Sequence, residues 1–213
     1  MNGFIEVYKE AFAGFPYFES YSTEDVREVW DEHTTNGRII LAKIGESVVG
    51  LGCSIPLHKA PQDVLDFLAE RKEAGLLPDD FTPQSACYMS ELAVLTEHRR
   101  LKVGSQLVRH RLIHVSHDRY KYYVMRTDSE NSNSMHLYLS VGATRVPGVH
   151  NVSSGDQVTK NGSQSELRMY LYGQSVDALH SLTTRLSEDQ EEGPSDEPET
   201  SSDTDENKGD EAK

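Results

Sequence analysis

Cysteine is scarce in this sequence, since only Cys53 and Cys87 among the 213 residues carry a thiol. Both fall within expected strands, which indicates small buried side chains in a reducing compartment rather than a disulfide framework. No apolar stretch approaches the roughly 20 residues that span a bilayer, and the first residues lack the basic region and apolar run of a signal peptide. We therefore expect a cytoplasmic protein without a membrane segment.

Positive charge is also limited, with 21 Lys and Arg against 35 Asp and Glu and a formal net charge of −14. Residues 187–213 hold twelve of the acidic residues and two of the basic ones. This segment is rich in Ser, Thr, Pro and Gly, so it cannot bury enough apolar surface to offset its ordering entropy. We expect one domain over residues 1–186 and a disordered acidic tail over 187–213. The acidic balance argues against nonspecific nucleic-acid binding.

A strand, a basic loop and a helix form the most informative stretch of the chain. Residues 88–94 are an apolar run with strand formers, a turn follows, and a helical pattern begins near Gly104. The first N–H groups of a helix point outward and the helix dipole adds roughly half a positive charge. Because Arg99, Arg100 and Lys102 add whole charges, the sequence predicts a site for a phosphate or pyrophosphate.

The same loop resembles the acetyl-CoA signature of the Gcn5-related N-acetyltransferases (GNAT), which reads Arg/Gln-x-x-Gly-x-Gly/Ala. Here the loop reads Arg99-x-x-Lys102-x-Gly104. Lys102 stands where the family usually has a glycine that lets the backbone approach the pyrophosphate. A lysine that swings outward gives the phosphates a charge instead.

A second segment strengthens the resemblance. The family's Asn-x-x-Ala-x-x-Leu-Tyr-x-x-x-Gly-Phe pattern is matched by Asn131-x-x-Ser134-Met-x-Leu137-Tyr138-x-x-x-Gly142-Ala143. This segment follows the loop at the family's spacing, after a strand-like run over residues 122–127 that should pair in parallel with the preceding strand. Two motifs in the family's order carry the resemblance over residues 88–146, and fainter patterns extend it over most of residues 1–172.

The resemblance implies an α/β fold in which helices flank a mixed, mostly antiparallel sheet splayed around coenzyme A. Family members usually begin with a strand, whereas this chain begins with a helical pattern over residues 4–12. We therefore expect the first strand to be missing and the strand over residues 38–43 to be an exposed edge, through which a homodimer can form. The implied cosubstrate is acetyl-CoA, and the implied cofactor-binding residues are Leu92, Ala93, Val94, Arg99, Arg100, Lys102, Val103, Gly104, Ser105, Asn131 and Ser134.

Two residues are candidates for the chemistry of acetyl transfer. Tyr138 matches the family position whose phenol protonates the coenzyme A thiolate, although a core aromatic would look the same. Glu91 is an ionisable residue in the central strand, so it is a candidate general base, a carboxylate that orients the amine, or a structural residue. Strand alternation places Ser90 and Glu91 on opposite faces.

The acceptor is expected to be a primary amine. A helix over residues 62–73, inside the connection 56–83, and a long loop over 147–164 should lie side by side on the acceptor side of the sheet. Two polar loops suit a small-molecule amine, with a protein lysine or N-terminal amine as the second choice. A noncatalytic acyl-CoA-binding or interaction module is the alternative.

Further expectations concern the helix after Gly104, His33, two glycines and the end of the domain. On the helix after Gly104 we expect Leu107, Val108, Leu112 and Val115 to face inward and Arg109, Arg111 and Arg119 outward. His110, His114 and His117 share one helix face, which we interpret as solvated rather than metal-binding. His33 is expected at the surface, Gly50 and Gly52 are expected to mark a bulge, and residues 175–186 are expected to form one more helix.

Overall fold

The computed structural model describes residues 1–153 and 165–176. The chain begins with helix α1 (Asn2–Ala13), followed by α2 (Thr23–Asn36). A capping box starts α2, because the Ser22 side chain accepts from Asp25 N at 3.1 Å while the Asp25 carboxylate accepts from Ser22 N at 2.7 Å. Both helices were predicted, and no strand precedes α1 in the described residues.

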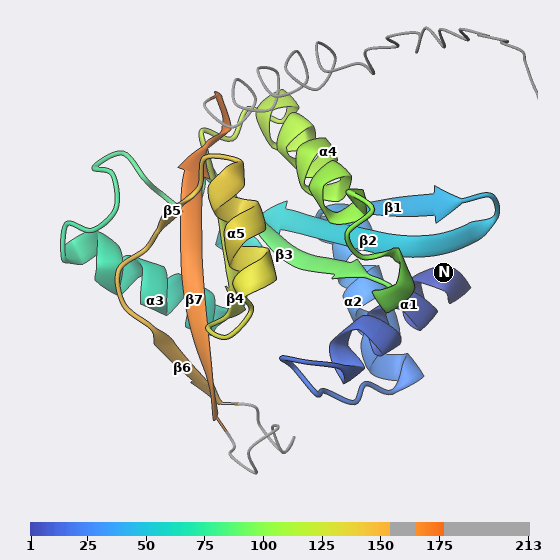
Figure 1. The fold of residues 1–213 in the computed structure, drawn as a ribbon. Coiled ribbons are helices and arrows are strands. Elements are labelled where there is room, and N and C mark those ends of the chain that lie inside the picture. Colours follow the sequence, from blue (N-terminus) through green and yellow to red (C-terminus); the bar gives the residue numbers. More distant parts are fainter. Residues whose placement is uncertain (154–164, 177–213) are drawn as a thin grey trace, which may run out of the picture.

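The described strands form one seven-stranded sheet in the order β1-β2-β3-β4-β7-β5, with β6 also paired to β7 (Figure 1). Only β3 and β4 pair in parallel, and every other pair is antiparallel. The mostly antiparallel sheet with β1 at one edge confirms the predicted fold. The strands are β1 (Arg38–Ile44), β2 (Ser47–Pro56), β3 (Ala86–Val94), β4 (Tyr122–Asp128), β5 (Thr144–Arg145), β6 (His150–Ser153) and β7 (Ser165–Gln174).

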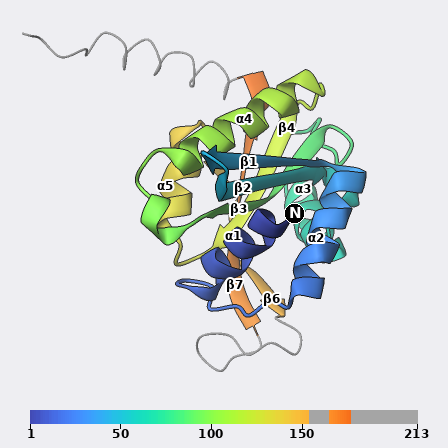
Figure 2. The same cartoon turned by 90° about the vertical axis from the view of Figure 1, so that its right-hand side faces the viewer.

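Helices cover both faces of the sheet (Figures 1 and 2). Side chains of β4 alternate, so that Tyr122 and Val124 join the core under α3, whereas Tyr123 and Met125 join the core under α4 and α5. Helices α1 and α2 pack on the same face as α3, over the inner part of β2. The further helices are α3 (Gln62–Glu73), α4 (Val103–His117) and α5 (Ser132–Ser140), with short 3-10 turns at Leu57–Lys59 and Thr96–His98.

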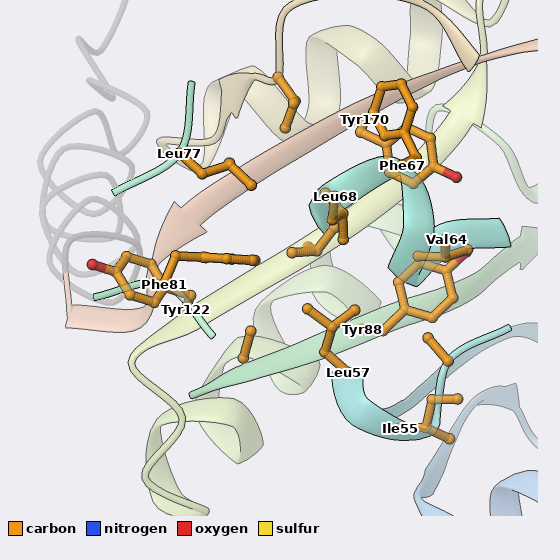
Figure 3. Close-up of a cluster of buried hydrophobic side chains, with 14 residues drawn as sticks. Ile55, Leu57, Val64, Phe67, Leu68, Leu77, Phe81, Tyr88, Tyr122 and Tyr170 are labelled. Atoms are coloured by element: carbon orange, nitrogen blue, oxygen red, sulfur yellow. The ribbon is translucent and has the colours of Figure 1, made fainter. Parts of the chain in front are cut away.

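Aromatic stacking holds helix α3, in the connection over residues 56–83, against the sheet. Figure 3 shows Phe67 of α3 against Tyr170 of β7, with ring centroids 4.5 Å apart. Phe67 also stacks on His150 of β6, with ring centroids 5.0 Å apart. The connection over residues 56–83 and the segment after β5 therefore lie side by side, as predicted. The predicted long loop is partly a strand, since β6 occupies His150–Ser153, and residues 154–164 lie outside the described residues.

The central strands separate partway along the sheet. Parallel pairing of β3 with β4 runs from Ala86↔Tyr122 to Met89↔Met125 and then stops. Strand β3 continues to Val94 paired only with β2, and Figure 1 shows the two halves of the sheet diverging there. The second half of β3 therefore presents one backbone edge to the gap.

The glycines of β2 allow α4 to approach closely, and the predicted bulge adjoins Gly50 but not Gly52. A Cβ on Gly50 would lie 3.1 Å from Leu107 Cδ1, and one on Gly52 would lie 3.1 Å from Cδ and Nε of Arg111. The register shifts directly after the Ala42↔Gly50 pair, which leaves Val49 as the extra residue, whereas Gly52 pairs regularly with Ile40 and Leu92. A side chain at either position would push α4 away from the sheet.

Two polar residues predicted at the surface are buried. Arg111 is 0% exposed because Gly52 leaves room for its side chain over β2. His33 is 3% exposed, with Nδ1 2.7 Å from Val29 O and Nε2 2.7 Å from Ser90 Oγ, so these two contacts satisfy the ring. The described parts of the chain contain no cluster of three or more His, Cys, Asp or Glu able to hold a metal ion.

Cys53 and Cys87 are buried free thiols, as the sequence indicated. No helix among residues 1–153 and 165–176 is long and apolar enough to cross a membrane. Most of the helix predicted over 175–186 and the whole tail over 187–213 lie outside the described residues.

Candidate active site

A cavity of about 660 Å³ lies where β3 leaves β4. Its walls are the end of β3, the first turns of α4 and α5, and the segment after α1 that includes Gly14 and Tyr17. Its volume is within the range of small-molecule sites. The residues predicted to bind the cofactor all line it: Leu92, Ala93, Val94, Arg99, Arg100, Lys102, Val103, Gly104, Ser105, Asn131 and Ser134.

The loop before α4 has an unusual backbone. Arg100 and Lys102 have φ angles of +63° and +60°, in the left-handed region that costs a non-glycine residue about 1–2 kcal/mol. Lys102 is the N-cap of α4, and neither a capping side chain nor an acidic residue occupies the first turn. The first intrahelical bond joins Gln106 N to Lys102 O at 3.0 Å, so the N–H groups of the first turn are available for an anion.

The free edge of β3 supplies further donors. Leu95 N donates to Val49 O at 3.0 Å, so alternate residues of β3 direct their N–H groups toward β2. By the same alternation, the N–H groups of Leu92 and Val94 point away from β2, toward the gap. Arg99 Nε donates to Val94 O at 3.2 Å, which ties the basic loop to the end of the strand.

Asn131 links two walls of the cavity. Its Oδ1 accepts from Ser134 N at 3.1 Å, which caps α5. Its Nδ2 donates to the hydroxyl of Tyr17 at 3.2 Å. The structure therefore shows Asn131 as the N-cap of α5, and its binding of the cofactor stays a prediction.

A β-bulge determines the face that Glu91 occupies. Ile55 pairs with Tyr88 and Cys53 with Glu91, so one residue of β2, Ser54, opposes two of β3, Met89 and Ser90. Glu91 therefore lies on the same face as Tyr88, and the strict alternation assumed from the sequence fails at Ser90. Glu91 is half-buried, and burial raises its pKa to about 7, an effect that the positive charge of Arg126 opposes.

An acidic cluster with one arginine lies near Glu91. Arg168 Nη2 is 3.1 Å from Glu19 Oε1 and also pairs with Glu166, while Nη1 is 3.8 Å from Asp128 Oδ2. Both Glu19 and Arg168 affect the pKa of Glu91. Sequence reasoning missed this cluster because residues from three distant segments form it.

Tyr138 is buried behind the cavity and does not line it. Its side chain is 4% exposed and packs in the core under α4 and α5. Burial raises the pKa of Tyr138 to about 12, and the neighbouring guanidinium of Arg111 opposes that rise. The structure therefore places the two candidate catalytic residues, Tyr138 and Glu91, around the cavity but outside its lining.

Comparison with solved structures shows first that the fold is a known one. The fold is similar to ribosomal-protein-alanine N-acetyltransferase from Brucella melitensis (13% identity, TM-score 0.57, covering 80% of this chain and 91% of that one). It is also similar to yncA from Salmonella typhimurium, solved with its cofactor acetyl-CoA (14% identity, TM-score 0.56, 80% and 86%). A third similar structure is the Bacillus subtilis acetyltransferase in complex with CoA (14%, 0.52, 79% and 91%).

The family follows from the sequence itself. Residues 4–143 match the model of the acetyltransferase (GNAT) family, and the chain belongs to that family. The predictions of the family, and of an acyltransferase enzyme, are therefore confirmed. No curated protein matches the sequence.

Proposed function

We propose that this protein transfers the acetyl group of acetyl-CoA to a primary amine. The observation that supports this most directly is the cavity between β3 and β4, where a helix N-terminus, three basic side chains and a free strand edge meet. The helix N-terminus and the basic side chains suit the phosphates of acetyl-CoA. The N–H groups of Leu92 and Val94 suit the amide groups in its pantetheine arm. Bound there, acetyl-CoA supplies an activated thioester carbonyl.

The charges near Glu91 favour a cationic amine as acceptor. Glu19, Asp128 and Glu166 surround Arg168, so three carboxylates share one positive charge. Two further cations act on Glu91: Arg126 is already paired with Asp63 at 2.9 Å, and Arg111 reaches the strand from α4, on the other face of the sheet. The excess negative charge attracts an ammonium group to the acceptor side of the sheet.

Glu91 is the proposed general base. With a pKa of about 7, its carboxylate is substantially ionised at neutral pH and is basic enough to take a proton from an ammonium group. The Tyr138 hydroxyl, protonated at neutral pH, is the proposed donor to the leaving sulfur. Both side chains are outside the cavity lining. Proton transfer to Glu91 and from Tyr138 therefore requires a side-chain movement or a bridging water molecule.

A small-molecule amine is the first choice of acceptor, because α3 and β6 pack closely over the acceptor side. A protein N-terminal amine is the second, supported by similarity to ribosomal-protein-alanine N-acetyltransferases from Brucella melitensis and Escherichia coli. The free thiols of Cys53 and Cys87 support a reducing location such as the cytoplasm. A homodimer through the edge strand β1 also belongs to this proposal.

An amine panel tests the function. Purified protein and acetyl-CoA are incubated with small monoamines, diamines and peptides with free N-termini, and coenzyme A release is followed. We expect turnover, fastest with amines that carry a second positive charge. If acetyl-CoA binds but no amine reacts above the buffer rate, the chain is a noncatalytic acyl-CoA-binding module.

A further inference from the structure

Arg111 is a buried arginine at the centre of the molecule. It lies on α4, 0% exposed, with its side chain crossing Gly52. Its Nη1 donates to Glu91 O at 2.8 Å and to Cys53 O at 3.1 Å. These carbonyls flank the bulge of β3, so one role of Arg111 is to satisfy backbone groups that the bulge leaves without partners.

The rest of the guanidinium is not satisfied. Nε and Nη2 of Arg111 are buried and have no hydrogen-bond partner in the structure. Among the described residues, no carboxylate lies within 4.0 Å of the group. An unpaired buried charge costs several kcal/mol, so two carbonyl bonds alone are a weak reason to place an arginine here rather than a neutral donor.

Tyr138 is the polar group beside this charge. Tyr138 packs in one core cluster with Val108 and Leu112, which lie beside Arg111 on α4. Burial raises the pKa of its phenol, and the guanidinium of Arg111 opposes that rise. Nε and Nη2 of Arg111 make no hydrogen bond to the phenol. Tyr17, from the segment after α1, and Glu91, from β3, also act on the phenol. Arg111 is the only cation among these three neighbours.

We propose that Arg111 is the positioning residue for Tyr138: its buried guanidinium orients the phenol hydroxyl and compensates the negative charge that Tyr138 carries after donating its proton. This inference rests on the proposed acetyl transfer. It assigns a role to a residue of this chain that lies outside both matched motifs.

The proton balance shows when the positive charge is needed. A neutral amine nitrogen bonds to the acetyl carbon, the carbon–sulfur bond breaks with its electron pair on sulfur, and the Tyr138 proton moves to that sulfur. Tyr138 is then a phenolate, until the proton released by the new amide nitrogen restores the phenol. A buried phenolate is costly without a nearby cation. Arg111 is already buried and charged, so it stabilises the phenolate without rearrangement.

A double-mutant cycle separates this role from a merely structural one. Arg111→Met removes the charge and keeps an unbranched side chain, while Arg111→Lys keeps the charge and loses the paired carbonyl contacts. Each variant is measured with Tyr138 present and with Tyr138→Phe. If Arg111 acts through Tyr138, its loss matters only when the phenol is present.

We expect Arg111→Met to lower kcat by at least ~tenfold with Tyr138 present and by less than ~threefold with Tyr138→Phe. Arg111→Lys should recover a large part of the lost kcat. Equal losses in both backgrounds would overturn the proposal, because a structural residue affects both alike. Arg111→Gln, which is neutral but retains N–H donors, replaces the Met variant if that variant does not fold.

A second readout does not depend on turnover. Difluorotyrosine, whose phenol is more acidic, is placed at position 138, and its ionisation is followed by fluorine NMR without acetyl-CoA. Since a cation favours the phenolate, Arg111→Met should raise the midpoint by at least ~1 pH unit and Arg111→Lys should leave it near the wild-type value. An unchanged midpoint in Arg111→Met refutes the charge compensation. If no amine is acetylated, the proposed function fails, and this titration still decides whether Arg111 acts on the phenol.

Discussion

The side-chain amide of Asn131 donates to the hydroxyl of Tyr17 at 3.2 Å, joining the first turn of α5 to the segment after α1 across the cavity. The two residues are 114 positions apart in the sequence. The other end of the same amide caps α5. One side chain thus holds two walls of the proposed cofactor site at a fixed separation.

Asn131→Ala should destabilise the protein by about 1 kcal/mol, because it removes a helix cap. It should also weaken acetyl-CoA binding, since the cavity loses a donor and a wall loses its tether. Thermal unfolding and calorimetric titration with acetyl-CoA measure the two effects. Tyr17→Phe is the matched control, because it removes the tether and keeps the cap. Equal loss of affinity in both variants would show that the tether, rather than an amide contact to the cofactor, is what matters.

Acetyl-CoA should stabilise the folded protein by about 2.7 kcal/mol at a hundredfold excess over Kd. Arg99→Ala should reduce the accompanying thermal shift, because Arg99 lines the cavity and ties the loop to Val94. Lys102→Gly should keep that shift and raise the stability of the unbound protein by about 1 kcal/mol, because glycine adopts a φ of +60° without strain. A smaller acetyl-CoA shift in Lys102→Gly would identify Lys102 as a phosphate ligand.

Glu91→Gln should flatten the acidic limb of the pH–rate profile, which in the wild type rises through pH 7 as the carboxylate ionises. A rise in KM with the limb intact would assign Glu91 to orienting the amine instead.

The same variant has a stability signature. The pKa of Glu91 is raised from 4.5 to about 7, so the folded state holds this proton more tightly than the unfolded chain, and the wild type loses up to about 3 kcal/mol as pH rises from 4.5 to above 7. Glu91→Gln should therefore melt higher than the wild type at pH 8 and equally at pH 4.5. Equal melting temperatures at pH 8 would mean that burial does not penalise this carboxylate.

Tyr138→Phe should lower kcat more than tenfold and leave acetyl-CoA affinity nearly intact, since only the hydroxyl is lost and general acid catalysis typically contributes ~10²–10⁴-fold. Tyr123→Phe is the control: it removes a phenol from the same core, where the hydroxyl contacts Val141 O at 3.2 Å. Steady-state kinetics should show a change only at position 138. Wild-type kcat in Tyr138→Phe would make this residue part of the core alone.

Local patterns in the sequence predicted the elements well. The strand, basic loop and helix around Gly104 formed as expected. The helix expected over residues 62–73 is observed as α3 (Gln62–Glu73), whose buried side is formed by Val64, Phe67 and Leu68. The two motifs also brought every predicted cofactor-binding residue to one cavity. These features follow from neighbours within a few turns of chain, which a sequence displays directly.

The errors came from judging polar residues by type instead of position. Arg111 lies four residues after Leu107 and four before Val115, on the apolar stripe of α4, and His33 lies seven residues after Val26, on the buried face of α2. Spacing alone places both inward. Gly52, which makes room for Arg111, and Ser90, which contacts His33, lie on strands distant in the sequence from α4 and α2. No local pattern could therefore identify these partners.

The bulge in β3 makes the length of that strand as important as its composition. The extra residue decides the face that Glu91 occupies: in a regular strand Glu91, three positions after Tyr88, would face α4 and α5, where Val108 and Leu112 form an apolar core. Deleting Ser90 would leave Glu91 on the face of Tyr88, but it would remove the hydroxyl that contacts His33 and shorten the strand before the basic loop by one residue, about 3.3 Å. The bulge thus gives β3 one more residue of length without turning the proposed acceptor-side base into a buried, unpaired carboxylate.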